Sequence, residues 1–333
     1  MMMNFCTLFD SYYLPKGLIL YDSLCKVCDD FHLYVFAFDD RCYQKLNDLQ
    51  FQHMTVISLK EFETEELLKV KPTRTRAEYC WTCGASTIWY TIQRFNLDHC
   101  TYIDADLMFF HSPKFAFDEI DEKGASIALT RHFTEVENLA GQFCVQFVYF
   151  KNDKDGMQAL KWWKDSCIEW CFARYENGKF GDQKYLDYFP LKFANVHVME
   201  HRGIGVAPWN MNLYTYPDTK MLQYNGQKYP VVFFHYHGTK IDINHRKLVL
   251  HPITYDIPKV VEDCFFVPFL ENYEKACKQY LNQDIDGFII EKRSWHEQTM
   301  FFLKRILRNN LLVRFIYNLW LRFIRKIHRT RFN

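Results

Sequence analysis

The sequence contains no stretch of about eighteen uncharged apolar residues, the length that a membrane-spanning helix requires. Residues 1–13 contain no basic segment followed by a long apolar one, so we expect no signal peptide. Internal repeats, low-complexity segments and clear linkers are also missing. The net charge of the 333 residues is only +1, which excludes a general electrostatic attraction to nucleic acid, and we expect no nucleic-acid partner.

The 12 cysteines do not show the spacing of a disulfide framework. Cys25 and Cys28 form one Cys-x-x-Cys pair and Cys80 and Cys83 form another, in different surroundings. A zinc site built from both pairs is one interpretation. We favour free, largely buried thiols in a reducing compartment, and we therefore expect a cytoplasmic protein.

Hydrophobic residues make up 49% of the chain and charged residues 24%, a composition typical of a sizeable packed core. Apolar segments alternate with segments of helical spacing over residues 4–58, an order typical of parallel strands joined by crossover helices. We expect an α/β fold with strands at residues 4–9, 32–38, 54–58, 101–103, 125–129, 143–150, 195–199 and 231–235. The expected helices span residues 14–25, 41–49, 61–70, 77–95, 156–175, 182–188 and 271–280, with another around residue 261.

Two carboxylates, Asp104 and Asp106, stand between the apolar segments 101–103 and 107–110. Acidic side chains at the exit of a buried strand are costly unless positive charge meets them. Ligands of α/β proteins bind beyond the carboxyl ends of the strands, and Mg²⁺ or Mn²⁺ bridging a diphosphate would satisfy both acids. A solvated loop or a helix cap is the alternative interpretation.

A second strand, residues 231–235, ends in a histidine, and further polar residues follow it: His235, His237, Gly238 and Lys240. A neutral imidazole suits a third metal position, a glycine lets the backbone approach a phosphate, and a lysine neutralises diphosphate charge. Structural histidines are the alternative interpretation.

Asp182 and Gln183 follow the loop 177–181 at the expected start of a helix. Asp182 caps that helix in the simpler interpretation. In the functional interpretation both side chains bind sugar hydroxyls or stabilise positive charge developing on the sugar. The loop 201–210 adds Trp209 as a platform for a sugar ring or, alternatively, as a core residue.

These segments, in this order, resemble those of GT-A nucleotide-diphospho-sugar transferases, especially family 8-type bacterial glycosyltransferases. The resemblance spans residues 4–241 and includes the opening strand and its loop, residues 102–106, the Asp-Gln pair and the His-x-x-Gly segment. It implies a GT-A, Rossmann-like fold with a mixed, mainly parallel sheet flanked by helices. It departs from the family pattern at residues 141–146, at Lys184 and after Lys240.

The resemblance also implies roles. Asp104, Asp106 and His235 hold Mn²⁺ or Mg²⁺, with His237 as the alternative to His235. Asp182 and Gln183 are the catalytic pair. Gln183 lies at the reacting face of a retaining enzyme, which we favour, and Asp182 is the base of an inverting one. The residues implied for binding the nucleoside-diphosphate sugar are Phe9, Asp10, Tyr12, Asp104, Gly238 and Lys240.

The implied activity is transfer of a sugar from that donor to a glycan or lipid-linked acceptor, in cell-surface polysaccharide or lipopolysaccharide synthesis. A nucleotidyltransferase is an alternative, although residues 9–16 lack its Gly-rich phosphate loop. A non-catalytic, membrane-associated scaffold with the same fold is another.

The chain after Glu297 contains no acidic residue and many basic ones, which alternate with apolar residues at helical spacing. We expect this tail to be a basic amphipathic helix that binds an anionic membrane surface, which makes the protein peripheral on the cytoplasmic face. Docking of the tail on the catalytic domain is the alternative. The expected domains are a GT-A domain over 1–245, a helical extension packed on it over 246–298, and the tail over 299–333.

Overall fold

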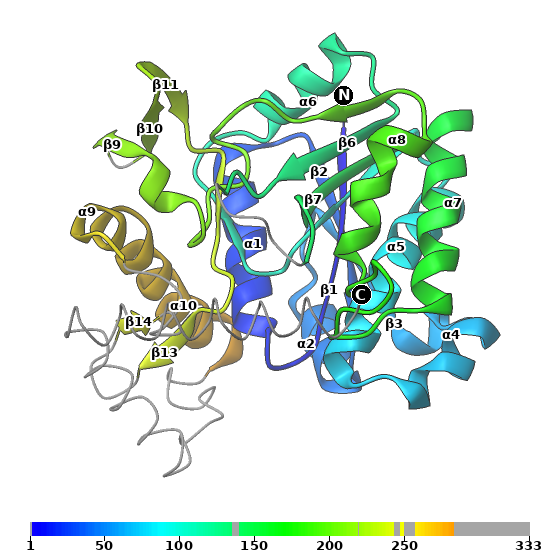
Figure 1. Cartoon of the computed structure of the whole chain (residues 1–333). Coiled ribbons are helices and arrows are strands. Elements are labelled where there is room, and N and C mark those ends of the chain that lie inside the picture. The colour runs from blue at the N-terminus through cyan, green and yellow to red at the C-terminus, as the bar shows by residue number, and fades with distance from the viewer. Residues whose placement is uncertain (1, 135–139, 219, 243–246, 250–256, 283–333) are drawn as a thin grey trace, which may run out of the picture.

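The centre of the fold is a seven-stranded sheet in the order β3-β2-β1-β4-β7-β6-β8 (Figure 1). The computed structural model describes residues 2–134, 140–218, 220–242, 247–249 and 257–282. The predicted α/β class is confirmed. The strands of this sheet are β1 (Met3–Phe9), β2 (Phe31–Ala37), β3 (Met54–Ser58), β4 (His99–Ile103), β6 (Ile127–Arg131), β7 (Phe143–Lys151) and β8 (Val196–Val198).

One half of the sheet is parallel. β1 pairs in parallel with β2 and β4, and β2 pairs in parallel with β3. The crossovers between the first three strands run through α1 (Leu14–Val27) and α2 (Asp40–Leu49). Such crossovers are required because the chain must return to the same end of the sheet before it starts a parallel neighbour. The carboxyl ends of these strands therefore share one edge.

The other half contains one reversed strand. β7 runs antiparallel to both β4 and β6, and β8 is parallel to β6. The register pairs Ile103, the last residue of β4, with Phe147 of β7. The residues of β7 just before Phe147 consequently lie beside the turn that follows β4. The sheet is mixed and mainly parallel, as predicted.

Alternate side chains of the sheet enter two separate hydrophobic cores. Phe5 of β1 belongs to one and Cys6 to the other, as the two-residue period of a strand requires. α1, α2 and α6 cover the first face, and α5, α7 and α8 cover the second (Figure 1). The further helices are α3 (Leu59–Phe62), α4 (Glu65–Val70), η1 (Lys71–Thr73), α5 (Arg76–Phe95), α6 (Lys114–Glu122), α7 (Lys154–Glu169), η2 (Gln183–Tyr188), α8 (Phe189–Lys192) and η3 (Met211–Leu213).

Two predicted helices were wrong in extent. The helix expected over 61–70 is split into α3 and α4, because Ser58 and Thr64 each accept a backbone N–H and cap a separate start. The helix expected over 156–175 ends at Glu169, and the chain beyond it forms a loop with a bridge between Glu176 and Lys179.

Small strands complete the part of the chain that the structure describes. β5 (Leu107–Phe109) pairs with β12 (Phe233–His235) in antiparallel fashion, and β13 (Lys240–Asp242) pairs with β14 (Lys247–Val249). The sequence did not predict the meander of β9 (Thr215–Asp218), β10 (Met221–Tyr224) and β11 (Gln227–Pro230). Its strands show little hydrophobic alternation because most of their residues are partly exposed.

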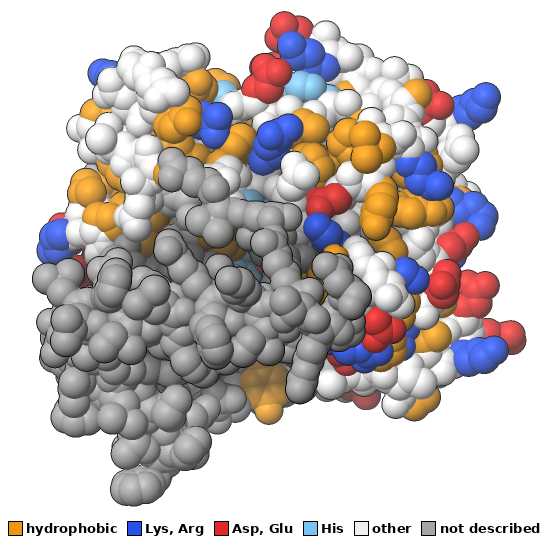
Figure 2. Space-filling view, in the orientation of Figure 1, with side chains coloured by type: hydrophobic (Ala, Val, Ile, Leu, Met, Phe, Trp, Pro, Cys, Tyr) orange, Lys and Arg blue, Asp and Glu red, His pale blue; other side chains and the backbone are white. Residues whose placement is uncertain are grey.

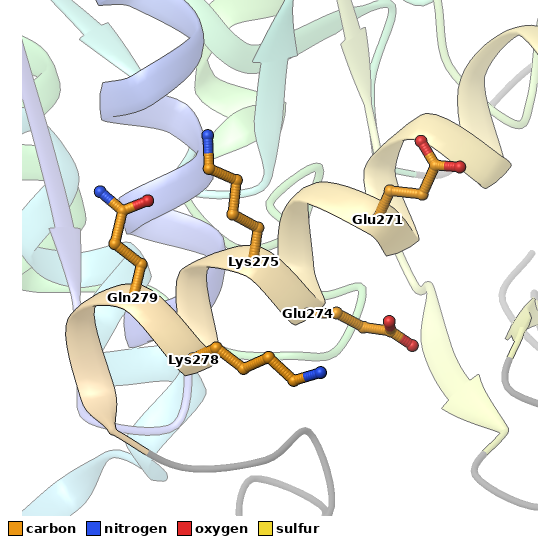
Figure 3. A pocket seen from close by; sticks show the side chains of 5 residues that line it. All are labelled: Glu271, Glu274, Lys275, Lys278 and Gln279. Atoms are coloured by element: carbon orange, nitrogen blue, oxygen red, sulfur yellow. The ribbon is translucent and has the colours of Figure 1, made fainter.

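Residues 257–282 pack on the first core. They contain α9 (Lys259–Val261), the π-helical turn η4 (Glu262–Phe266) and α10 (Val267–Leu281). Tyr280 donates a hydrogen bond to Asp22 of α1 at 2.7 Å, and the rings of Tyr236 and Phe269 stack at 3.8 Å. Among the described residues, a cavity of ≈ 510 Å³ along α10 is lined by Glu271, Glu274, Lys275, Lys278 and Gln279 of that helix (Figure 3). None of these five is a predicted site residue.

The predicted tail, 299–333, lies outside the described residues, and so do residues 246, 250–256 and 283–298 of the predicted extension, 246–298. Within the described ranges, no helix has the length and apolar character to cross a bilayer. The face seen in Figure 2 shows basic and acidic side chains interspersed, in keeping with the small net charge of the sequence.

The close packing of α7 on the sheet gives a stability test at Gly156. A Cβ at this position would lie 2.2 Å from the backbone oxygen of Lys151. We expect Gly156→Ala to lower the free energy of unfolding by about 1–3 kcal/mol in urea denaturation, because overpacking outweighs the roughly 1 kcal/mol that alanine gains in a helix. Gly84→Ala in α5 is the control, since its Cβ has an ordinary contact at 3.5 Å. Equal stability changes in the two variants would contradict this account.

Candidate active site

Asp104 and Asp106 lie in the turn between β4 and β5. The buried strand β4 ends at Ile103, and the turn is closed by a hydrogen bond from Leu107 N to Asp104 O at 3.3 Å. Asp104 N donates to the backbone oxygen of Gln146 on β7 at 3.2 Å. Both carboxylates are thus held where the parallel strands end, as the sequence indicates, and Asp106 is only 6% exposed.

His235 reaches the two aspartates through the pairing of β12 with β5. The register places His235 opposite Leu107, the residue after Asp106, and Tyr236 N donates to Asp106 O at 2.9 Å. Nε2 of His235 lies 3.1 Å from Asp106 Oδ1 and 3.5 Å from Asp104 Oδ2. The structure therefore brings together three residues that the sequence predicts as metal ligands.

The other ring nitrogen of His235 is already engaged. Nδ1 lies 2.8 Å from Oε1 of Gln146, an acceptor, so Nδ1 carries a proton and donates it. In a neutral ring, Nε2 would then present a lone pair to two carboxylates. This arrangement is favourable only if Nε2 is protonated or if a cation lies between the three groups. One nitrogen and several carboxylate oxygens suit Mn²⁺ and also Mg²⁺, so the donor set fits a divalent ion.

The pKa values of the three groups differ, although Asp106 and His235 are both buried and Asp104 is partly buried. Burial raises the pKa of Asp104 to about 6, against the attraction of His235 and with added repulsion from Asp106. Burial also opposes ionisation of Asp106, but the positive charges of His235 and Lys16 outweigh it and hold its pKa well below 3.8. Burial lowers the pKa of His235, but the two carboxylates, Asp106 above all, raise it above 6.5.

Lys16 lies beside Asp106 and Tyr13 lies beside Lys16, and the sequence patterns indicated neither residue. Lys16 Nζ lies 3.6 Å from Asp106 Oδ2 and 4.4 Å from the centre of the Tyr13 ring. The charge of Asp106, together with burial, raises the pKa of the Tyr13 hydroxyl. Lys16 could have been found from its position in the first turn of the helix after the opening strand, because that turn faces the carboxyl edge of the sheet.

Cys144 of β7 is a further group that the sequence did not single out. Ligand atoms of Asp104, Cys144 and His235 all lie within 4.8 Å of one another. Asp106 is not part of this group, although its Oδ1 lies 3.1 Å from His235 Nε2, and no such group that includes a cysteine of a Cys-x-x-Cys pair occurs among the described residues. The two Cys-x-x-Cys pairs accordingly do not assemble a zinc site there, and all 12 cysteines are free thiols.

Asp182 does not act as the helix cap of the simpler interpretation. It precedes the 3₁₀ helix η2, and its side chain makes no capping hydrogen bond. Burial, and then the charge of Asp104, raise its pKa to about 7. Gln183 donates its side-chain N–H to Ala140 O at 3.1 Å. Asp182 is therefore electrostatically part of the site around Asp104.

The three residues at and after the end of β1 that are predicted to meet a nucleotide have different environments. The Phe9 ring is buried against α1, where a Cβ on Gly17 would lie 2.3 Å from it, so this side chain belongs to the core. Asp10 accepts hydrogen bonds from Tyr12 N and Tyr13 N and pairs with Arg76 at 2.7 Å. Tyr12 is 48% exposed, with the Arg76 guanidinium 5.1 Å from its ring centre.

Of the residues that follow β12, His237, Gly238 and Lys240 are exposed, whereas Tyr236 and Thr239 are buried. The ring of His237 is 5.6 Å from that of His235, and Trp209 lies 5.3 Å from His235 and 5.6 Å from His237. Gly238 has φ +65°, a left-handed conformation that favours glycine. Lys240 is exposed and begins β13. Of the two candidate histidines, the ion pairs with Asp104 and Asp106 involve His235.

Comparisons with known proteins identify relatives and a fold. The chain is 33% identical over 247 residues to the uncharacterized protein YfnD of Bacillus subtilis (strain 168), which covers 71% of this chain and 77% of YfnD. It is 30% identical over 273 residues to the uncharacterized protein YfnF of the same organism, which covers 78% of this chain and 89% of YfnF. No protein-family model matches the chain.

Among solved structures, the galactosyltransferase LgtC in complex with donor and acceptor sugar analogs superposes with a TM-score of 0.52. The sequences are 12% identical, and the match covers 86% of this chain and 100% of that one. This likeness confirms the predicted GT-A fold.

Two buried histidines of the site give a test of its electrostatics. In the metal-free protein we expect His235 to titrate above pH 6.5, because of its carboxylate neighbours, and His132 to titrate at about 4, because burial lowers its pKa. Asp106→Asn should lower the pKa of His235 and leave His132 neutral above pH 5. Two-dimensional NMR of the imidazole nitrogens checks this, and a His235 pKa unchanged by Asp106→Asn would contradict the assignment.

Proposed function

The chain belongs to the same family as YfnD and YfnF of Bacillus subtilis, and we propose that it is a metal-dependent glycosyltransferase. The observation that carries this proposal is the convergence of Asp104, Asp106 and His235 at the carboxyl edge of a GT-A sheet, with an imidazole nitrogen turned toward one buried and one partly buried carboxylate. Such a cluster stabilises a bound cation far more than it stabilises the empty fold.

In this proposal Asp104, Asp106 and His235 hold Mn²⁺ or Mg²⁺. The ion supplies Lewis-acid stabilisation of the negative charge on a leaving nucleoside diphosphate. The positively charged residues near the aspartates would determine where that diphosphate binds. Lys16, 3.6 Å from Asp106, adds a fixed positive charge on the α1 side. After β12, the exposed Lys240 would add a second cation, and the left-handed Gly238, with nothing within 4 Å of a Cβ, an open backbone.

The donor is a nucleoside-diphosphate sugar, with its nucleotide along the loop after β1. Tyr12, exposed and held beside Arg76, provides an aromatic face for the base. Asp10 is fixed by two backbone N–H groups and by Arg76, so its carboxylate is pre-oriented for a polar contact. The core position of Phe9 leaves it a supporting role beneath this loop.

The reacting sugar lies near Asp182 and Gln183 in this proposal. Gln183, the first residue of η2, binds the reacting face of the sugar in a retaining reaction, which we favour. Asp182, with a pKa of about 7, carries a proton for part of the time at neutral pH. An inverting reaction would use its ionised form to take the proton of the acceptor hydroxyl.

The acceptor in this proposal is a glycan or a lipid-linked saccharide of the cell surface. The basic pattern of residues 299–333 supports attachment to an anionic membrane on the cytoplasmic side, and this support comes from the sequence alone. A peripheral enzyme of this kind would meet a lipid-linked acceptor at the surface where that acceptor is presented.

A nucleotide-release assay on the full chain, with UDP- and GDP-sugars and with or without Mn²⁺, tests the activity. We expect Mn²⁺-dependent release with one donor class. Asp104→Asn and Asp106→Asn should each reduce it by about 100-fold or more, because metal-ion stabilisation amounts to several kcal/mol and each 1.36 kcal/mol is tenfold in rate. Asp165→Asn, on the exposed side of α7, is the control and should keep full activity.

The outcomes separate the alternatives. Pyrophosphate release from a nucleoside triphosphate with a sugar phosphate would identify a nucleotidyltransferase. Absence of Mn²⁺-dependent nucleotide binding in calorimetry, together with no turnover, would favour the non-catalytic scaffold. Release that is unaffected by both aspartate variants would refute the metal site.

A further inference from the structure

Gln146 contacts two of the three clustered residues, His235 and Asp104. It lies on β7 and is fully buried. Its side-chain oxygen accepts the hydrogen bond from His235 Nδ1 at 2.8 Å, and its backbone oxygen accepts the one from Asp104 N at 3.2 Å. One residue thus joins the turn after β4 to the end of β12, which are distant in sequence.

We propose that Gln146 is a positioning residue that fixes the ring of His235 so that Nε2 faces Asp104 and Asp106. The proposal rests on the proposed role of His235 as a metal ligand. The amide oxygen can only accept, so it selects the ring form in which Nδ1 bears the proton and Nε2 is the ligand atom. A histidine that binds a metal is commonly held by such a partner on its other nitrogen, and loss of the partner weakens metal binding.

The amide of Gln146 is poorly explained as a packing group. Its Nε2 is buried and has no hydrogen-bond partner among the described residues. An unpaired buried N–H group costs free energy, and an apolar side chain of similar volume would avoid that cost. The amide is retained, in this view, for the hydrogen bond that its oxygen makes with His235.

Gly205 provides the room for this amide. It has φ +98°, a conformation that side chains rarely adopt, and a Cβ there would lie 2.6 Å from Gln146 Nε2 and 2.7 Å from Thr130 Cγ2. Asn210 donates to the backbone oxygens of Gly205 and of His132, the residue after β6, both at 2.9 Å, and so holds this loop against the end of β6. A side chain at position 205 would push the amide toward His235 or displace the loop.

The first experiment measures the affinity of the full-length protein for Mn²⁺ by electron paramagnetic resonance of the free ion. We expect Gln146→Met to weaken binding by about 10- to 100-fold, because methionine fills the space without orienting the imidazole. Gln146→Glu keeps an acceptor at the same place and should restore binding to the level of the unsubstituted protein or tighten it. Equal weakening by Met and Glu would overturn the proposal.

A double-substitution cycle separates positioning from a general effect on the fold. In a His235→Ala background, Gln146→Met should cause no further loss of Mn²⁺ affinity, because the group that it orients is gone. A loss of the same size in both backgrounds would show that Gln146 acts through the fold alone and would overturn the proposal. The nitrogen spectrum of metal-free protein, recorded at a pH above the pKa of His235 where its ring is neutral, adds a readout without metal: the Nδ1–H form of His235 should predominate in the unsubstituted protein and lose that predominance in Gln146→Met.

Gly205→Ala tests the same contact from the other side, with Gly226→Ala as the matched control. Both glycines have positive φ, +98° and +80°, so both substitutions strain the backbone. Only the Cβ at 205 meets Gln146, since nothing lies within 4 Å of a Cβ at 226. We expect weaker Mn²⁺ binding for Gly205→Ala alone, and equal affinities in the two variants would count against the proposal.

These measurements distinguish two kinds of failure. If the unsubstituted protein does not bind Mn²⁺ and Asp104→Asn changes nothing, the proposed metal site is wrong. If the unsubstituted protein binds Mn²⁺ and requires Asp104 and His235, but Gln146→Met binds equally well, only the positioning role is wrong.

Discussion

The placement of two neighbouring carboxylates at the end of β4 is the constraint around which the site is organised. Asp106 is buried and Asp104 is partly buried in the same turn, where negative charge is costly unless positive charge is near. His235 and Lys16 supply it from two other elements. This arrangement of charges favours a bound cation, and the proposed activity rests on it.

The neighbouring structure serves to hold these charges in place. The antiparallel pairing of β5 with β12 sets His235 beside Asp106, and the reversed strand β7 supplies Gln146 behind both. Gly205 lets the loop between them approach closely. Because each contact joins segments that are distant in sequence, the ligand geometry depends on the packing of the whole sheet rather than on one motif.

Local patterns were sufficient for much of the fold. The three parallel strands and their crossover helices are apolar over short runs, and their ends were predicted to within one residue for β1, β2 and β3. The errors fall where a polar side chain changed the local structure. Thr64 starts a new helix inside a segment of continuous helical spacing, and residues 215–230 form strands that are too exposed to show alternation.

The sequence by itself determined that two acids follow a buried strand and that a histidine ends another, because strands with apolar residues and the charges at their ends are local features. Only the tertiary structure decided that His235 rather than His237 faces the aspartates, that Lys16 joins them, that the ring of Phe9 is in the core, and that Gln146 lies behind His235. The physical reason is that long-range pairing and packing set the register of a strand. A shift of the register by one residue reverses the direction of every side chain of that strand.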